Sequence, residues 1–250
     1  MSGHSHWATI KRAKGAADAK KGKVFSKLSR AIIIAARHGG GDPDMNLKLR
    51  YAIDKARQAS MPKDNIDRAI KKGTGEGGTE IYEELVYEGY GPGGVAMLVE
   101  VTTDNRNRTN TEVRKLIERS GGKMGSQGAV SWMFERKGFM VVDAKGVDED
   151  MLMEIVLEAG ADDLKRAGPN FDITCDPAHF NKVQEVLKKN NIATASAELS
   201  QLPKTPMEVD ADVARKVFKL MEALDDHDDV QNVYSNMHMT DEVAAAAAAE

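Results

Sequence analysis

Positive charge in this chain is concentrated in its first 78 residues, and this segregation constrains most strongly what the chain can fold into. Residues 1–78 contain 17 Lys and Arg against 7 Asp and Glu, whereas residues 79–250 contain 18 against 32. The total of −4 therefore conceals a basic module joined to an acidic one. Because a dense basic segment without matching acids is typical of a surface that meets phosphate groups, the pattern predicts a separate nucleic-acid-binding module at the start of the chain.

The bulk composition is that of a soluble globular protein. The chain has 250 residues, of which 41% are hydrophobic and 30% are charged, so it can form one to three domains with modest cores. The single cysteine, Cys175, excludes an internal disulfide framework and suits a reducing compartment. The longest apolar run, residues 31–36, is too short to span a bilayer, and no secretory signal is recognisable. We therefore expect a cytoplasmic protein.

The basic module divides into an arm and three helices. Residues 2–23 are rich in Ala, Gly and Lys and have too few apolar residues to pack, so we expect this arm to be mobile until it binds a partner. Apolar residues then recur at intervals of three and four over 24–38, 46–60 and 62–72, which predicts three short helices. Their tight connections predict a small bundle.

The glycine-rich sequence GTGEGG at 73–78 marks the best domain boundary. Beyond it, strands and helices alternate with short connections, which predicts an α+β protein with two α/β domains of split βαβ type. Thr109 and Glu112 have the spacing of a capping box that opens a helix, and a hinge is expected at 137–138. The expected strands are 85–87, 95–101, 130–134, 139–142, 171–175, 194–199 and 230–239, and further helices are expected at 151–159, 180–189 and 213–224. The pattern leaves open whether the segment after 206 returns to complete the first α/β domain.

The candidate nucleic-acid-binding residues are the cations, histidines and tryptophan of the basic module, together with two arginines further along the chain. Lysines neutralise phosphates and release counterions, and Trp7 is able to stack on an unpaired base. Arg106 and Arg108 lie between a strand and a helix start, where an anion site and an ordinary polar turn are both open interpretations. The complete set is His4, His6, Trp7, Lys11, Arg12, Lys14, Lys20, Lys21, Lys23, Lys27, Arg30, Lys48, Arg50, Lys55, Arg57, Arg106 and Arg108.

Nothing in the sequence predicts catalysis, a cofactor or a metal site. GTGEGG lacks the Gly-Lys-Ser/Thr ending of a phosphate-binding loop. The acidic run DDHDD at 225–229 does not have the spacing of a calcium loop, and we interpret it as a solvated turn. Cys175 and His179 show no sign of an activated thiol. The expectation is a non-enzymatic binding protein.

Several short motifs give the chain a resemblance to a known family. They are GHS with Trp7 and Ala8, DAK with GK at 18–23, GGGDP at 39–43, EGYGPGG at 88–94, DNRNRT at 104–109 and DDVQ at 228–231. In this order they resemble the YebC/PmpR family, which includes the mitochondrial translational activator of cytochrome c oxidase. One departure is His6, where the family usually has Lys; contact there would be sensitive to pH. The alanine-rich tail at 244–250 is also idiosyncratic.

The resemblance implies three domains and no enzymatic activity. The implied limits are 1–78 for the basic arm and bundle, 79–133 with 206–243 for the second domain, and 134–205 for a third domain inserted into the second. For function it implies either a DNA-binding transcriptional regulator or a ribosome-associated translation factor that binds ribosomal or transfer RNA and aids synthesis of difficult, for example proline-rich, stretches. A scaffold whose acidic domains bind a protein partner is a third alternative. The oligomeric state is not predicted.

Overall fold

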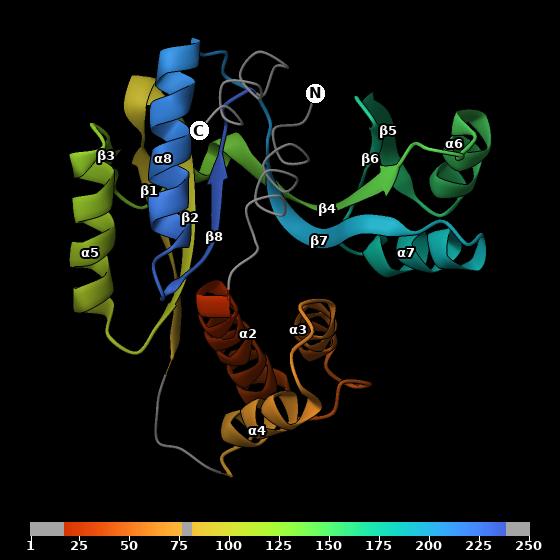
Figure 1. The fold of residues 1–250 in the computed structure, drawn as a ribbon, viewed down its shortest axis with the longest axis horizontal. Coiled ribbons are helices and arrows are strands. Elements are labelled where there is room, and N and C mark those ends of the chain that lie inside the picture. Colours follow the sequence, from red (N-terminus) through yellow and green to blue (C-terminus); the bar gives the residue numbers. More distant parts are fainter. Residues whose placement is uncertain (1–17, 77–81, 239–250) are drawn as a thin grey trace.

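The computed structural model describes residues 18–76 and 82–238, which form a helical bundle and two sheet domains (Figure 1). The bundle contains α2 (Asp18–Gly39), α3 (Leu47–Gln58) and α4 (Lys63–Gly73). Its core includes Ile32, Leu49 and Ile53. Asn46 joins the first two helices, because its side chain accepts the Leu49 N–H at the start of α3 and donates to the Ala35 carbonyl near the end of α2.

Helix α2 begins six residues before the expected start at 24, so the expectation of an unpacked arm up to residue 23 is wrong for its last part. The physical reason is a long-range contact. Lys23 donates to the carbonyl of Asp226 at 3.1 Å, and Lys27, one turn later, donates to the carbonyl of Asp225. The acidic turn thus holds the first half of α2. The arm residues before Asp18, with His4, His6, Trp7, Lys11, Arg12 and Lys14, lie outside the described residues.

The first sheet has the strand order β3-β1-β2-β8, and all its pairs are antiparallel. Helices α5 and α8 cover one face of this sheet (Figure 1), and Val99, Val113 and Val217 are among the side chains buried between the layers. The elements are β1 (Glu83–Tyr90), β2 (Ala96–Thr103), α5 (Arg106–Arg119), β3 (Lys123–Met124), α8 (Ala211–Asp225) and β8 (Val230–Ser235).

The second sheet has the order β5-β6-β4-β7 and is formed entirely between β3 and α8. Its elements follow one another as β4 (Phe134–Asp143), α6 (Glu149–Glu158), β5 (Ala161–Ala167), β6 (Asn170–Cys175), α7 (Phe180–Lys189) and β7 (Thr194–Pro203). This is a split βαββαβ domain. Because β8 pairs with β2 after the whole second sheet has been completed, the predicted fold class, with the third domain inserted into the second, is confirmed.

The bundle also contacts the second sheet domain. The ring of Tyr51 on α3 meets the Phe180 ring edge-on, with 5.4 Å between centroids, and its hydroxyl donates to Asn181. Lys55 lies 3.3 Å from Glu198 on β7. Helix α3 therefore has one side against the inserted domain.

Three local expectations are wrong, and one strand has no counterpart among the expected elements. Helix α5 begins at Arg106 with Asn105 as its N-cap, so Thr109 lies inside the first turn rather than in a capping box. Ser131–Met133 is a 3₁₀ turn rather than a strand, because the Glu88 carboxylate accepts N–H groups in this segment. Strand β4 passes through 137–138 without a hinge. Strand β5 was not expected, because its sequence ADDLKRA carries four charges.

No described helix combines the length and apolar character that crossing a membrane requires.

We predict that Gly138→Ala destabilises the inserted domain. A Cβ at this position in β4 would lie 2.5 Å from Cys175 Sγ and 2.7 Å from a ring carbon of Phe180, both buried. Overpacking of this kind costs about 1–3 kcal/mol of unfolding free energy, measured by urea denaturation. The matched control is Gly22→Ala, exposed on α2 with no atom near the new Cβ, which should leave stability unchanged or raise it by up to about 1 kcal/mol. Equal effects of the two substitutions would contradict the packing described here.

Candidate nucleic-acid interface

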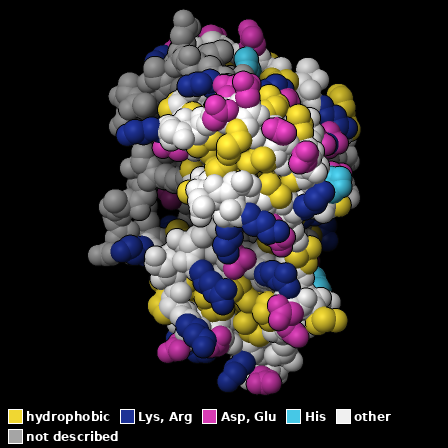
Figure 2. Space-filling view, turned by 90° about the vertical axis from the view of Figure 1, so that its right-hand side faces the viewer, with side chains coloured by type: hydrophobic (Ala, Val, Ile, Leu, Met, Phe, Trp, Pro, Cys, Tyr) yellow, Lys and Arg dark blue, Asp and Glu magenta, His cyan; other side chains and the backbone are white. Residues whose placement is uncertain are grey.

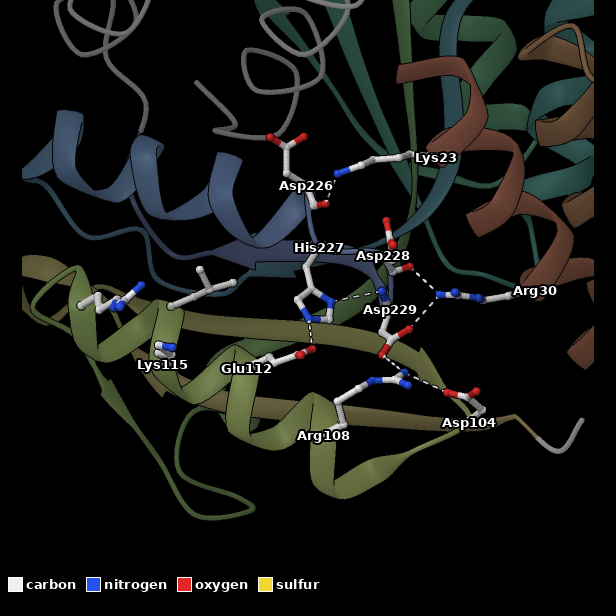
Figure 3. A pocket seen from close by; sticks show the side chains of 12 residues that line it. Lys23, Arg30, Asp104, Arg108, Glu112, Lys115, Asp226, His227, Asp228 and Asp229 are labelled. Carbon is white, nitrogen blue, oxygen red and sulfur yellow. Dashed lines mark hydrogen bonds and ion pairs between the residues drawn. The ribbon is translucent and has the colours of Figure 1, made fainter. Parts of the chain in front are cut away.

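A cleft of about 590 Å³ separates α2 of the bundle from α5 of the first sheet domain, with the turn after α8 at its base (Figure 3). Cations and anions line it together. The lining residues are Lys23, Arg30, Asp104, Arg108, Glu112, Lys115, Leu116, Arg119, Asp226, His227, Asp228 and Asp229.

The side chain of Asp229 is the centre of this arrangement. It is 2% exposed, and its Oδ1 accepts from Arg30 of α2 at 2.9 Å. Its Oδ2 accepts from Arg108 at 2.7 Å and from the hydroxyl of Thr109 at 2.6 Å, both on α5. Thr103, at the end of β2, lies 3.2 Å from the same oxygen. One buried carboxylate therefore joins the bundle, the first sheet and α5.

The charges of this cluster are stabilised by their mutual contacts. Burial alone would raise the pKa of Asp229, but hydrogen bonds from Thr109 and Arg108 and the charges of Arg108 and Arg30 outweigh it, and the pKa is lowered. Hydrogen bonds to Asp229 and Asp104 raise the pKa of Arg108 further above its already high value. Asp229 and Arg108 are therefore both charged at neutral pH.

Main-chain carbonyls at the end of α8 and in the turn after it hold three cations of α2. Lys23 and Lys27 bind the carbonyls of Asp226 and Asp225, and Arg30 donates to the carbonyl of Asp228 at 2.6 Å. The last carbonyls of a helix lack intrahelical partners and carry partial negative charge, so cations are favourable there. The basic face of α2 thus docks on a helix C-terminus.

His227 orders the turn from within. Its Nδ1 accepts the backbone N–H of Asp229 at 3.1 Å, so in the neutral ring the proton is on Nε2, which faces Glu112 Oε2 at 2.8 Å. This pair links the turn to α5 and positions the Asp229 backbone.

The structure separates the predicted binding residues into two groups. Lys23, Lys27, Arg30 and Arg108 contact the acidic turn as described. Lys48 pairs with Glu84 at 2.6 Å, Lys55 with Glu198, Arg50 with Asp44 and Arg57 with Asp54, all at exposed positions. Arg106 is exposed at the start of α5, and Lys21 is exposed on α2.

The interpretation of 225–229 as a solvated turn is wrong for Asp229. Asp226 and Asp228 are exposed, but Asp229 is buried because its carboxylate accepts from Arg30 of α2 and from Arg108 and Thr109 of α5. Thr103 and Thr109 also escaped the sequence reasoning. The motifs DDVQ and DNRNRT lie about 120 residues apart in the chain and meet at this carboxylate in the fold. Neither motif alone indicates the contact.

The only cysteine of the chain, Cys175, is buried. Burial raises the pKa of Cys175 to about 11, so its thiol stays protonated. Across the described ranges 18–76 and 82–238, no group of three or more His, Cys, Asp or Glu is arranged to hold a metal ion.

A basic bundle docked on two α+β domains, one inserted into the other, defines a class of three-domain protein. Residues 5–76 match the family model described as the TACO1/YebC protein N-terminal domain, and residues 82–237 match that of the TACO1/YebC second and third domain. The chain belongs to the TACO1/YebC family, as the motif resemblance indicated.

Relatives of similar length carry one common name. A protein of Syntrophus aciditrophicus (strain SB) is 52% identical over 244 residues, covering 97% of this chain and 98% of its own, and one of Treponema pallidum (strain Nichols) is 55% identical over 243 residues, covering 97% and 99%. Each is named a probable transcriptional regulatory protein. The crystal structure of a conserved hypothetical protein from Aquifex aeolicus is 46% identical, with a TM-score of 0.81 and coverage of 90% of this chain and 93% of that one.

We predict that Asp229→Asn lowers the free energy of unfolding by about 1–3 kcal/mol at pH 7, because Arg30 and Arg108 lose a charged hydrogen-bond acceptor, while Arg108 keeps its pair with Asp104. The folded-state pKa of Asp229 is depressed, so its contribution is present above the unfolded pKa of about 3.9 and is lost as pH falls through the folded value. The difference from wild type should therefore narrow below about pH 4. Urea denaturation followed by circular dichroism measures the loss of unfolding free energy at pH 7 and its narrowing at pH 3.

The matched control is Asp228→Asn, one residue away and exposed, which should change stability by no more than about 0.5 kcal/mol. Equal losses of unfolding free energy for the two variants would show that the contacts of the buried Asp229 carboxylate do not stabilise the fold more than an exposed aspartate does.

Proposed function

We propose that this protein is a non-enzymatic regulator of gene expression that binds nucleic acid through its helical bundle, as a transcriptional regulator. The observation that carries the proposal is the segregation of charge, with 17 Lys and Arg against 7 Asp and Glu in residues 1–78. Phosphate backbones attract such a module in any sequence context. The names of the relatives support regulation of transcription as the process.

The proposed surface is the outer side of the bundle. In Figure 2, Lys and Arg side chains gather over the lower half of the molecule, where the bundle lies, with Asp and Glu between them. Lys23, Lys48 and Lys55 contact the sheet domains. The other exposed cations of the described bundle are Lys21, Arg50, Arg57, Lys63, Arg68 and Lys71. The acidic sheet domains, which repel phosphate, orient the molecule so that the bundle meets the nucleic acid first.

The mode we propose is contact with phosphates rather than reading of bases. A recognition helix presents side chains such as Arg, Asn and Gln from its first turns to base edges. In the described bundle, the basic face of α2 contacts the acidic turn, and Lys48 in the first turn of α3 pairs with Glu84. These side chains are therefore not presented to base edges. Helix α4 begins with Lys63, Asp64 and Asn65, of which Asp64 would face phosphates unfavourably.

A translation factor that binds ribosomal or transfer RNA is the second candidate. The basic bundle without an evident recognition helix favours it equally, because proteins recognise double-stranded RNA through its shape and backbone. Direct comparison of the two ligands separates the candidates.

Binding is tested by fluorescence anisotropy of labelled duplex DNA and of labelled transfer RNA between 50 and 200 mM salt. If about six phosphates are engaged, affinity falls by about 10³-fold over this range. A preference for the duplex supports the transcriptional regulator, and a preference for the RNA supports the translation factor. Absence of binding to either, or binding that is insensitive to salt, refutes the proposal.

We predict that replacing Lys20, Lys21 and Lys23 by Ala weakens binding and flattens its salt dependence, because up to two phosphate contacts, from Lys20 and Lys21, are lost. Lys23 is replaced with them although it also donates to the Asp226 carbonyl. The control replaces three exposed lysines of the inserted domain, Lys145, Lys165 and Lys189, and so removes the same charge elsewhere. The slope of log affinity against log salt should fall only in the first variant. Equal salt slopes in both variants would show that the basic segment does not contact the nucleic acid.

A further inference from the structure

Tryptophan 132 is a large apolar side chain held in an exposed position on the first sheet domain. The residue is 66% exposed, and it lies in the 3₁₀ turn Ser131–Met133. The indole N–H donates to the carbonyl of Ala129 at 3.1 Å, and the hydroxyl of Tyr90, itself 38% exposed, donates to the same carbonyl at 3.2 Å. Two exposed aromatic rings therefore share one anchor.

A buried carboxylate positions the loop that carries this anchor. Glu88 on β1 is 6% exposed, and its two oxygens accept the N–H groups of Gly128, Val130 and Ser131 at 2.7–2.8 Å. Burial would raise the pKa of Glu88, but these three hydrogen bonds outweigh it and lower the pKa, so the carboxylate is charged at neutral pH.

Apolar contacts fix the loop from below. Val130 and Phe134 pack with Ala96, Leu98 and Tyr234 on the sheet face that α5 and α8 leave uncovered. Hydrogen bonds to the Glu88 carboxylate thus hold the backbone of the loop, and apolar contacts hold its side chains on the sheet. Trp132 is therefore exposed on a segment that hydrogen bonds and packing hold in place.

Two exposed lysines flank the aromatic pair. Lys123 on β3 is opposite Tyr90 on β1 in the antiparallel register, and since its neighbour Met124 is buried on the helix-covered face, Lys123 lies on the same face as Tyr90. The backbone N–H of Lys204 donates to the carbonyl of Met133, which places this exposed lysine next to the 3₁₀ turn that carries Trp132.

Aromatic rings interleaved with cations suit one ligand in particular. An unpaired nucleobase stacks on an aromatic side chain regardless of its identity, and lysines on either side neutralise the adjoining phosphates. A duplex cannot use this platform, because its bases are already stacked on one another. A protein partner would gain nothing from the lysines unless it were acidic.

We propose that Trp132 and Tyr90, with Lys123 and Lys204, form a stacking site for one unpaired base of a single-stranded nucleic acid. The proposal rests on the nucleic-acid-binding function proposed above and deepens it, because it assigns a second contact to the first sheet domain. The basic bundle would hold the phosphates of the same ligand, and Trp132 would select its single-stranded segment.

The fluorescence of Trp132 tests this directly, because the chain has only two tryptophans. With Trp7 replaced by Phe, the protein is titrated with oligo(U), with oligo(dT) and with a blunt duplex of equal length, while anisotropy of a label on each ligand reports binding independently. Both single strands should quench Trp132, and the duplex should not. Stronger quenching by oligo(U) assigns the site to RNA, and stronger quenching by oligo(dT) assigns it to DNA.

Substitutions separate stacking from charge. Trp132→Ala should weaken single-strand binding by roughly 5- to 150-fold, and Trp132→Phe should recover most of the loss. Replacing Lys123 and Lys204 by Ala should lower the salt slope by about 1.4, since each phosphate contact contributes about 0.7 for single strands. Leu157→Ala, at an exposed apolar position of the inserted domain, is the matched control and should bind as wild type does.

Glu88 acts as a positioning residue, so Glu88→Gln should lower the fluorescence anisotropy of Trp132 in the free protein and weaken single-strand binding together. Single strands that bind, by their labels, without any change in Trp132 fluorescence would overturn the stacking site and leave the function proposed for the bundle intact. Absence of binding to every nucleic acid would overturn both.

Discussion

The interaction on which the rest of the structure depends is the burial of the Asp229 carboxylate between Arg30 and Arg108. These three side chains come from the turn before β8, from α2 of the bundle and from α5 of the first sheet domain. Taking one carboxylate out of water is expensive, and two arginines and a threonine hydroxyl compensate it here. The charge segregation of the sequence therefore has an internal consequence: the basic and acidic modules bind one another before either meets a partner.

This docking divides the cations of the bundle by role. Those on one side of α2 are occupied by Asp229 and by carbonyls at the end of α8, whereas others, such as Lys63 and Lys71 on α4, are exposed. The proposed nucleic-acid surface is accordingly the outer side of the bundle, and the platform around Trp132 would add a base contact to it. Contacts with phosphates and with one stacked base would together favour a backbone-directed, sequence-tolerant mode of binding.

Many of the helices and strands could be predicted from the sequence, because the spacing of apolar residues along each segment determines them. Helix α7 occupies the expected residues since Phe180, Val183 and Leu187 recur on one face and are buried. The match to the N-terminal family domain ends at residue 76, inside the glycine-rich sequence at 73–78. The errors have physical causes. Thr109 had the spacing of a capping residue, yet Asn105 caps the helix and Thr109 serves Asp229, 120 residues away. Burial of Asp229 and the early start of α2 depend on contacts that no sequence window contains, and β5 is too highly charged to be recognised as a strand.

The measurement that tests the central claim most directly is ultraviolet crosslinking in growing cells, followed by sequencing of the attached nucleic acid and mass spectrometry of the crosslinked peptides. The account predicts crosslinks in peptides of the bundle and in the peptide that contains Trp132. Attached reads upstream of particular genes would identify a transcriptional regulator, and reads from ribosomal or transfer RNA would identify a translation factor. Crosslinks confined to α6 and α7 of the inserted domain, or no crosslinked nucleic acid, would contradict the account.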